Sequence, residues 1–156
     1  QISIKKKFDS IDSIVGSCMF INKSCFNKIG GFDENIFLYF EETEYCYRGK
    51  LNNYKSYQTN ELNAKISGMS VQLNEKEKNE MSHLLIWHFI WSKFYFYKKK
   101  YGKKISIIIF LPTMIRAYLK LNLHKIFKND KQIVKYRARL DGLLSSIKGE
   151  KSYLRP

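Results

Sequence analysis

The chain has 156 residues, of which 44% are hydrophobic and 15% aromatic, so it is long enough and apolar enough to bury a core. Its formal net charge of +14 is unevenly placed, because residues 1–80 hold 11 basic and 11 acidic side chains whereas residues 81–156 hold 17 and 3. A uniformly lysine-rich composition cannot explain this difference in charge between the two halves of the chain. A basic block of this kind favours an anionic partner, such as an acidic lipid surface, a phosphorylated ligand or nucleic acid.

The cysteines indicate the redox compartment of the protein, and the first residue indicates whether the sequence is part of a longer chain. Cys18, Cys25 and Cys46 are odd in number and form no Cys-x-x-Cys pair. We therefore expect free thiols that pack as small apolar side chains in a reducing compartment. No signal peptide is present and Gln1 is not a natural start, so we expect the sequence to be a piece of a longer chain.

The first predicted elements are a strand and a short helix. Residues 13–22 are apolar with β-branched and aromatic members, which predicts a buried strand. Ser24 is placed to cap a helix that stops at the Gly30-Gly31 pair. A loop or short extended segment is expected at residues 33–39.

A second helix is predicted for residues 41–51. Its spacing turns Tyr45 and Leu51 inward and places Arg48 four residues after Glu44, a favourable offset for an ion pair. The following segments are predicted to be two edge strands and a solvated loop, at residues 54–58, 63–67 and 72–80.

The second half of the chain has a helical pattern. Residues 84–97 are almost continuously apolar or aromatic over a length that suits a helix. Residues 105–115 form an uncharged run that is shorter than the roughly twenty apolar residues needed to cross a bilayer. Basic residues continue this run as an amphipathic helix, which either lies in a membrane interface or packs on its own domain, and the sequence leaves both open. A last helix is predicted for residues 131–147.

Three neighbouring carboxylates are the strongest candidates for a catalytic site in this sequence. Glu41, Glu42 and Glu44 lie within four positions, directly behind an aromatic run. Like charges so close repel one another, and an apolar surrounding raises the cost of keeping all of them ionised. A carboxylate in a partly dry cleft can take a proton from a hydroxyl as a general base. The alternative is an acidic first turn that complements the helix dipole, and the residues alone favour neither.

Three stretches together resemble family-2 glycosyltransferases, in particular the bacterial rhamnosyltransferase-like enzymes of cell-surface polysaccharide assembly. They are Val15–Ile21, Phe26–Glu34 and Phe37–Arg48, which follow the family's order of Gly-Ala with a hydrophobic strand, Gly-Gly-Phe-Asp-Glu, and Phe-x-Tyr-x-Glu-Asp-x-Asp-x-Cys-x-Arg. The resemblance implies an α/β fold, namely the C-terminal part of a GT-A, Rossmann-like domain in residues 1–80. Residues 81–156 would then be a helical, basic tail.

The resemblance also implies an activity and roles for individual residues. The reaction would transfer a sugar, rhamnose in that branch, from a nucleotide-sugar donor to a hydroxyl of a cell-surface polysaccharide or lipid-linked acceptor, with inversion. By position, Glu42 matches the catalytic base, and Glu41 and Glu44 match the neighbouring acidic residues of the motif. Asp33 and Glu34 match the acidic residues on the acceptor side.

A divalent metal, Mg²⁺ or Mn²⁺, is expected in the full-length enzyme because the departing nucleoside diphosphate needs cationic stabilisation. The family's Asp-x-Asp metal motif is missing, since Asp9 and Asp12 are spaced Asp-x-x-Asp; we therefore expect the nucleotide-binding half to lie outside this sequence. Lys65 stands where relatives often have a metal-binding His, and its charge could face a metal site or a diphosphate. His83 and His88 are five residues apart and are not expected to form a metal pair.

The basic tail is expected to dock on the anionic inner face of the cell membrane, which would make the protein cytoplasmic and peripheral and bring it near a lipid-linked acceptor. Nucleic acid is not the expected partner of the transferase. Two alternatives stay open. One is a non-catalytic basic module that binds anionic membrane or nucleic acid, and the other is a degenerate transferase retained as a partner subunit.

Overall fold

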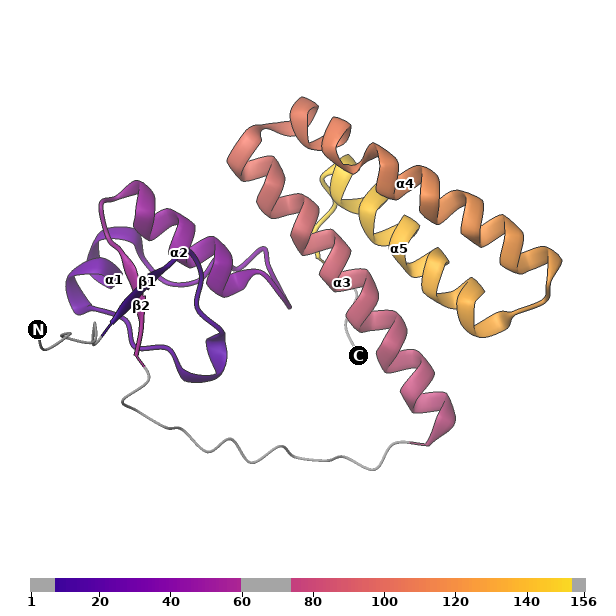
Figure 1. Ribbon diagram of the computed structural model, residues 1–156, viewed down its shortest axis with the longest axis horizontal. Coiled ribbons are helices and arrows are strands. Elements are labelled where there is room, and N and C mark those ends of the chain that lie inside the picture. The colour runs from indigo at the N-terminus through magenta and orange to yellow at the C-terminus, as the bar shows by residue number, and fades with distance from the viewer. Residues whose placement is uncertain (1–7, 60–73, 153–156) are drawn as a thin grey trace, which may run out of the picture. The chain divides into compact units, whose positions relative to one another are not determined.

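A computed structural model describes residues 8–59 and 74–152 of the chain (Figure 1). The described residues divide into two compact units. The first comprises residues 8–33 and 41–59, and the second comprises residues 34–40 and 74–152. The short segment 34–40 therefore belongs with the second unit, although residues of the first unit flank it on both sides in the sequence.

The first unit combines two short helices with a small sheet. Its two strands pair antiparallel, with Asp9 opposite Gln58 and Ile11 opposite Ser56. In chain order the elements are β1 (Asp9–Ile11), the 3₁₀ turn η1 (Gly16–Cys18), α1 (Lys23–Ile29), α2 (Glu41–Leu51) and β2 (Ser56–Gln58).

The prediction of an α/β, Rossmann-like fold is wrong. The described residues form five α-helices and one antiparallel sheet of two three-residue strands. The predicted strand at residues 13–22 contains η1, with extended backbone at Val15 and Met19 on either side, and it pairs with no strand in the described part of the chain. A strand requires a neighbour for its backbone N–H and C=O groups, and an apolar sequence does not supply that neighbour.

The two helices of the first unit agree with the sequence pattern in their positions. Asn22 caps α1 in place of Ser24, because its Oδ1 atom accepts a hydrogen bond from the backbone N–H of Ser24 at 2.8 Å. The helix ends at Gly30, whose φ of 78° suits glycine. In α2, Tyr45 is buried as predicted, whereas Leu51 is 65% exposed and the prediction that it faces inward is wrong. The predicted strand at residues 63–67 lies outside the described residues.

The second unit contains three long helices, α3 (Glu75–Tyr101), α4 (Lys103–Ile126) and α5 (Asp130–Lys148). All three were predicted, but α3 begins within the segment expected to be a loop. A capping box explains the early start, because the Asn74 side chain accepts from the N–H of Glu77 and the Glu77 carboxylate accepts from the N–H of Asn74.

Helix α5 packs against both α3 and α4, as Figure 1 shows. Its contact with α3 is close at Gly142, where an added Cβ atom would lie 2.6 Å from the carbonyl oxygen of Trp87. One core cluster joins all three helices through Ile90, Phe94, Phe110 and Leu143. His88 is 1% exposed, and its Nδ1 atom lies 3.0 Å from the hydroxyl of Ser152. This histidine is a buried core residue.

A candidate site at the start of helix α2

The segment that precedes α2 is fixed on α3. The Ser92 hydroxyl donates a hydrogen bond to the carbonyl oxygen of Leu38 at 2.8 Å, and Ser92 is fully buried. Ile36 is buried, and the Phe37 ring lies 4.9 Å from the His88 ring between centroids. The aromatic run that the sequence places before the acidic residues therefore serves to anchor the chain.

The last two residues before α2 have an unusual backbone. Tyr39 and Phe40 have φ angles of 64° and 69°, in the left-handed region that costs a non-glycine residue about 1–3 kcal/mol. Their rings pack on Phe89 at centroid distances of 5.6 and 5.7 Å, and this aromatic packing offsets the strain. The chain thus enters α2 from a segment with a defined, strained conformation.

The predicted acidic cluster is divided between different sides of α2. Glu42 and Glu44 are two residues apart and so point in nearly opposite directions around a helix. Glu44 is completely buried, and both of its carboxylate oxygens accept from Arg48 Nε at 2.8 Å, which confirms the predicted ion pair. The Arg48 guanidinium also donates to the carbonyl oxygens of Ile29 and Gly31. Glu44 therefore helps to hold the turn that follows α1.

Glu42 has a different environment. Its side chain is half-buried, and its carboxylate forms no hydrogen bond or ion pair with the described residues. It lies against Gly16, where an added Cβ atom would come within 2.0 Å of Glu42 Oε1. Next to it, the hydroxyls of Thr43 and Ser13 lie 3.0 Å apart and join the same two segments. A glycine at position 16 leaves the space that the carboxylate occupies.

Gly16 was not among the predicted site residues. The signal that could have identified it is its place in the first of the three stretches, where the glycosyltransferase pattern has Gly-Ala. Sequence spacing did not indicate that this glycine would face the start of α2, because the contact joins segments that are far apart in the chain.

Glu41 is partly buried, and its Oε2 atom has no hydrogen-bond partner among the described residues. Burial raises the pKa of the Glu41 carboxyl, and the charge of the adjacent Glu42 acts in the same direction. A hydrogen bond with the Glu41 backbone opposes this change only in part. Glu41 and Glu42 thus form an adjacent pair in which one carboxyl is biased toward its neutral form.

The other predicted site residues are Asp33, Glu34 and Lys65. Asp33 is partly buried and ends the first segment of the first unit, whereas Glu34 is exposed and belongs to the second unit. Lys65 lies outside the described residues. Within the two described ranges, no group of three or more His, Cys, Asp or Glu side chains could hold a metal ion. The described residues therefore supply no Mg²⁺ or Mn²⁺ site, and the metal expected in the full-length enzyme stays a prediction.

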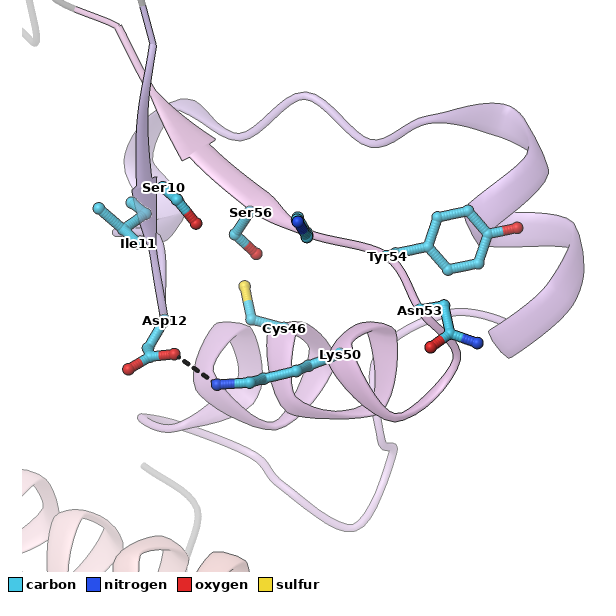
Figure 2. Close-up of a pocket in the computed structure, with 9 residues that line it drawn as sticks. Ser10, Ile11, Asp12, Cys46, Lys50, Asn53, Tyr54 and Ser56 are labelled. Carbon is cyan, nitrogen blue, oxygen red and sulfur yellow. Dashed lines mark hydrogen bonds and ion pairs between the residues drawn. The ribbon is translucent and has the colours of Figure 1, made fainter.

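A hollow of about 330 Å³ lies between the small sheet and α2 (Figure 2). Asp12 and Lys50 form an ion pair of 2.8 Å at this hollow, and Cys46 and Ser56 also line it. A second hollow of about 200 Å³ adjoins it and shares Cys46 and Ser56. Neither of these hollows is lined by Glu41 or Glu42, so the candidate carboxylates lie outside both.

Comparison with known proteins gives one short similarity. The low-salt glycan biosynthesis hexosyltransferase Agl10 of Haloferax volcanii is 46% identical to this chain over 43 residues. The aligned stretch covers 28% of this chain and 14% of the relative, so the chain spans only a small part of that protein. No family model and no solved structure matches the sequence. The similarity supports a relation to glycosyltransferases over that stretch.

Proposed function

We propose that this chain is part of a glycosyltransferase in which Glu42 is the general base. The observation that carries this proposal is the contrast between Glu42 and Glu44. Both oxygens of Glu44 accept from Arg48 and Glu44 is fully buried, whereas Glu42 is only partly buried and its carboxylate makes no hydrogen bond with the described residues. A general base needs a free lone pair and a position that a substrate can reach, and the partial exposure of Glu42, with no hydrogen bond to the described residues, supports this role.

The reaction is a transfer from a nucleotide-sugar donor to a hydroxyl of a lipid-linked or polysaccharide acceptor. The acceptor oxygen attacks the anomeric carbon while its proton passes to the Glu42 carboxylate, and the bond from the anomeric carbon to the nucleoside diphosphate breaks. Attack opposite the leaving group inverts the anomeric configuration.

The sequence comparisons support the class of donor. The matched relative is named a hexosyltransferase of glycan biosynthesis, and the resemblance to family-2 enzymes suggests a deoxyhexose such as rhamnose. A lipid-linked acceptor would place the protein at the inner face of the cell membrane as a peripheral enzyme. The metal requirement of the whole protein remains a prediction.

Glu42→Gln in the full-length enzyme tests the proposal. The amide cannot accept the acceptor proton, so we expect turnover to fall by about 10²- to 10⁴-fold while donor affinity stays near the wild-type value. Glu42→Asp keeps a carboxylate and should retain more activity than Glu42→Gln. Glu150→Gln, an exposed change in the second unit, is the control. Wild-type turnover in Glu42→Gln would remove Glu42 from this role.

A further inference from the structure

Helix α4 has apolar residues on two opposite faces. Its inner face, with Phe110, Ala117 and Leu121, is buried in the second unit. Its outer face is exposed, with Ile108 and Ile126 at 70% and 76%. At 100° per residue, six exposed side chains fall within roughly 80° of the helix circumference. These six residues, called the α4 outer face, are Ile105, Ile108, Ile115, Leu119, Leu123 and Ile126.

The six exposed residues of the α4 outer face form a row that is longer than the scattered apolar exposure of an ordinary protein surface. Single exposed aliphatic residues are common on soluble proteins, but a continuous row along a 24-residue helix marks an interaction surface. At 1.5 Å per residue the helix is about 36 Å long. The surface therefore fits an extended partner.

The charges around α4 identify that partner. At 100° per residue, exposed Lys104 and exposed Arg116 flank the α4 outer face, each about 20° beyond one of its edges, and exposed Lys128 follows the end of the helix. The entire positive excess of the chain lies in residues 81–156. An apolar row flanked by cations is complementary to a bilayer surface, where acyl chains receive the aliphatic residues and anionic headgroups receive the basic side chains.

The same helix is long and apolar enough to cross a membrane, unlike the eleven-residue run that the sequence pattern indicated. Packing argues against a crossing. Helix α5 lies along the inner face of α4, with Tyr136 near one end of the contact and Leu143 near the other. Between and beside these residues α5 carries exposed Lys131, Arg137 and Asp141. If α4 crossed the bilayer, these charges would enter the hydrocarbon core at a large cost in free energy.

We propose that α4 lies in the plane of an anionic lipid surface, with the α4 outer face inserted at the boundary between headgroups and acyl chains. This proposal assigns the contact to one face of one helix and sets its orientation. It does not depend on sugar transfer, so it can fail or hold separately from the proposed function.

Co-sedimentation of the full chain with vesicles tests the contact. We expect binding to phosphatidylcholine vesicles that contain phosphatidylglycerol, with weaker binding to phosphatidylcholine alone. The triple variant Ile108→Ser, Leu119→Ser, Ile126→Ser should lose at least about tenfold in vesicle affinity. The matched control is Phe26→Ser with Leu51→Ser, which removes exposed apolar side chains from the first unit and should bind as wild type. Circular dichroism verifies that each variant keeps its helices. Wild-type affinity in the triple variant would overturn the proposal.

The depths of two α4 residues in the bilayer distinguish a helix that lies in the plane of the membrane surface from one that crosses the membrane. Ile108 and Ile126 are 18 residues apart, which is five full turns, so they point in one direction but lie about 27 Å apart along the axis. Spin labels at Ile108→Cys and Ile126→Cys, each in a Cys18→Ser background that removes the exposed thiol, report their depths in the same vesicles. Equal, shallow depths support the proposal, and depths that differ by a large part of the bilayer refute it.

Discussion

Glu42 and Gly16 lie so close that a methyl group on Gly16 would come within 2.0 Å of Glu42 Oε1 and 2.7 Å of its Cγ and Cδ atoms. A small rotation of the carboxylate cannot relieve a contact that involves most of the side chain. Glycine at position 16 is therefore a condition for the observed orientation of Glu42. This contact between segments distant in sequence makes the position of the proposed base, Glu42, depend on Gly16, which has no side chain of its own.

Gly16→Ala should lower the turnover of the full-length enzyme by about 100-fold, because a displacement of roughly 1 Å at a catalytic group can have that effect. Steady-state kinetics measures the change, and thermal unfolding shows whether the variant is folded. Gly31→Ala is the control, since its added methyl group would meet only Phe26 Cε2 at 4.0 Å and the carbonyl that Arg48 binds is kept. Normal turnover in Gly16→Ala would show that the orientation of Glu42 does not limit the reaction.

Arg48→Ala should lower the free energy of unfolding by about 3–5 kcal/mol, because it removes the guanidinium that pairs with the fully buried Glu44 carboxylate. The carbonyl oxygens of Ile29 and Gly31 lose a donor in the same variant. Urea denaturation followed by circular dichroism measures the loss. Lys50→Ala on the same helix breaks an exposed ion pair with Asp12 and should change stability very little. Equal effects of the two variants would contradict the structural role of Arg48.

Glu41→Gln should gain stability relative to wild type as the pH rises. Burial raises the pKa of the Glu41 carboxyl above its ordinary value of 4.5, so the folded state holds this proton more tightly than the unfolded state does. The wild type has the benefit of that proton at low pH and loses it as the pH passes through the folded-state pKa. The variant does not titrate at this position, and its free energy of unfolding should therefore rise relative to that of wild type above about pH 4.5.

Urea denaturation at a series of pH values measures this difference. Glu41→Asp keeps a titrating carboxyl and is the control, which should follow the wild-type trend. A difference between Glu41→Gln and wild type that stays constant with pH would show that burial of Glu41 does not affect its titration.

Helices were predictable from the sequence because their signals are local. Residues 41–51 and 131–147 were placed within a residue or two, since apolar periodicity and end signals involve neighbours along the chain. The start of α3 was misjudged because its polar first turns resemble a loop, although Asn74 and Glu77 form a recognisable capping box.

The fold class was not predictable in the same way. Residues 13–22 have the composition of a buried strand, but composition does not say whether a partner strand is available, and in the described residues none pairs with this segment. The orientation of Leu51 was misjudged for a related reason. Which side of a helix is covered depends on neighbours that the helix sequence does not contain.

The sequence by itself determined which parts of the chain contain helices, that the positive charge is concentrated in residues 81–156, and that three carboxylates follow an aromatic run. Only the tertiary structure decided that Arg48 pairs with Glu44, whereas the Glu42 carboxylate lies beside Gly16 and makes no hydrogen bond with the described residues. It also decided that α5 covers the inner face of α4 and leaves the outer face exposed. The physical reason is that periodicity and charge are properties of the chain, whereas pairing, burial and the space around a carboxylate are set by contacts between segments that are distant in sequence.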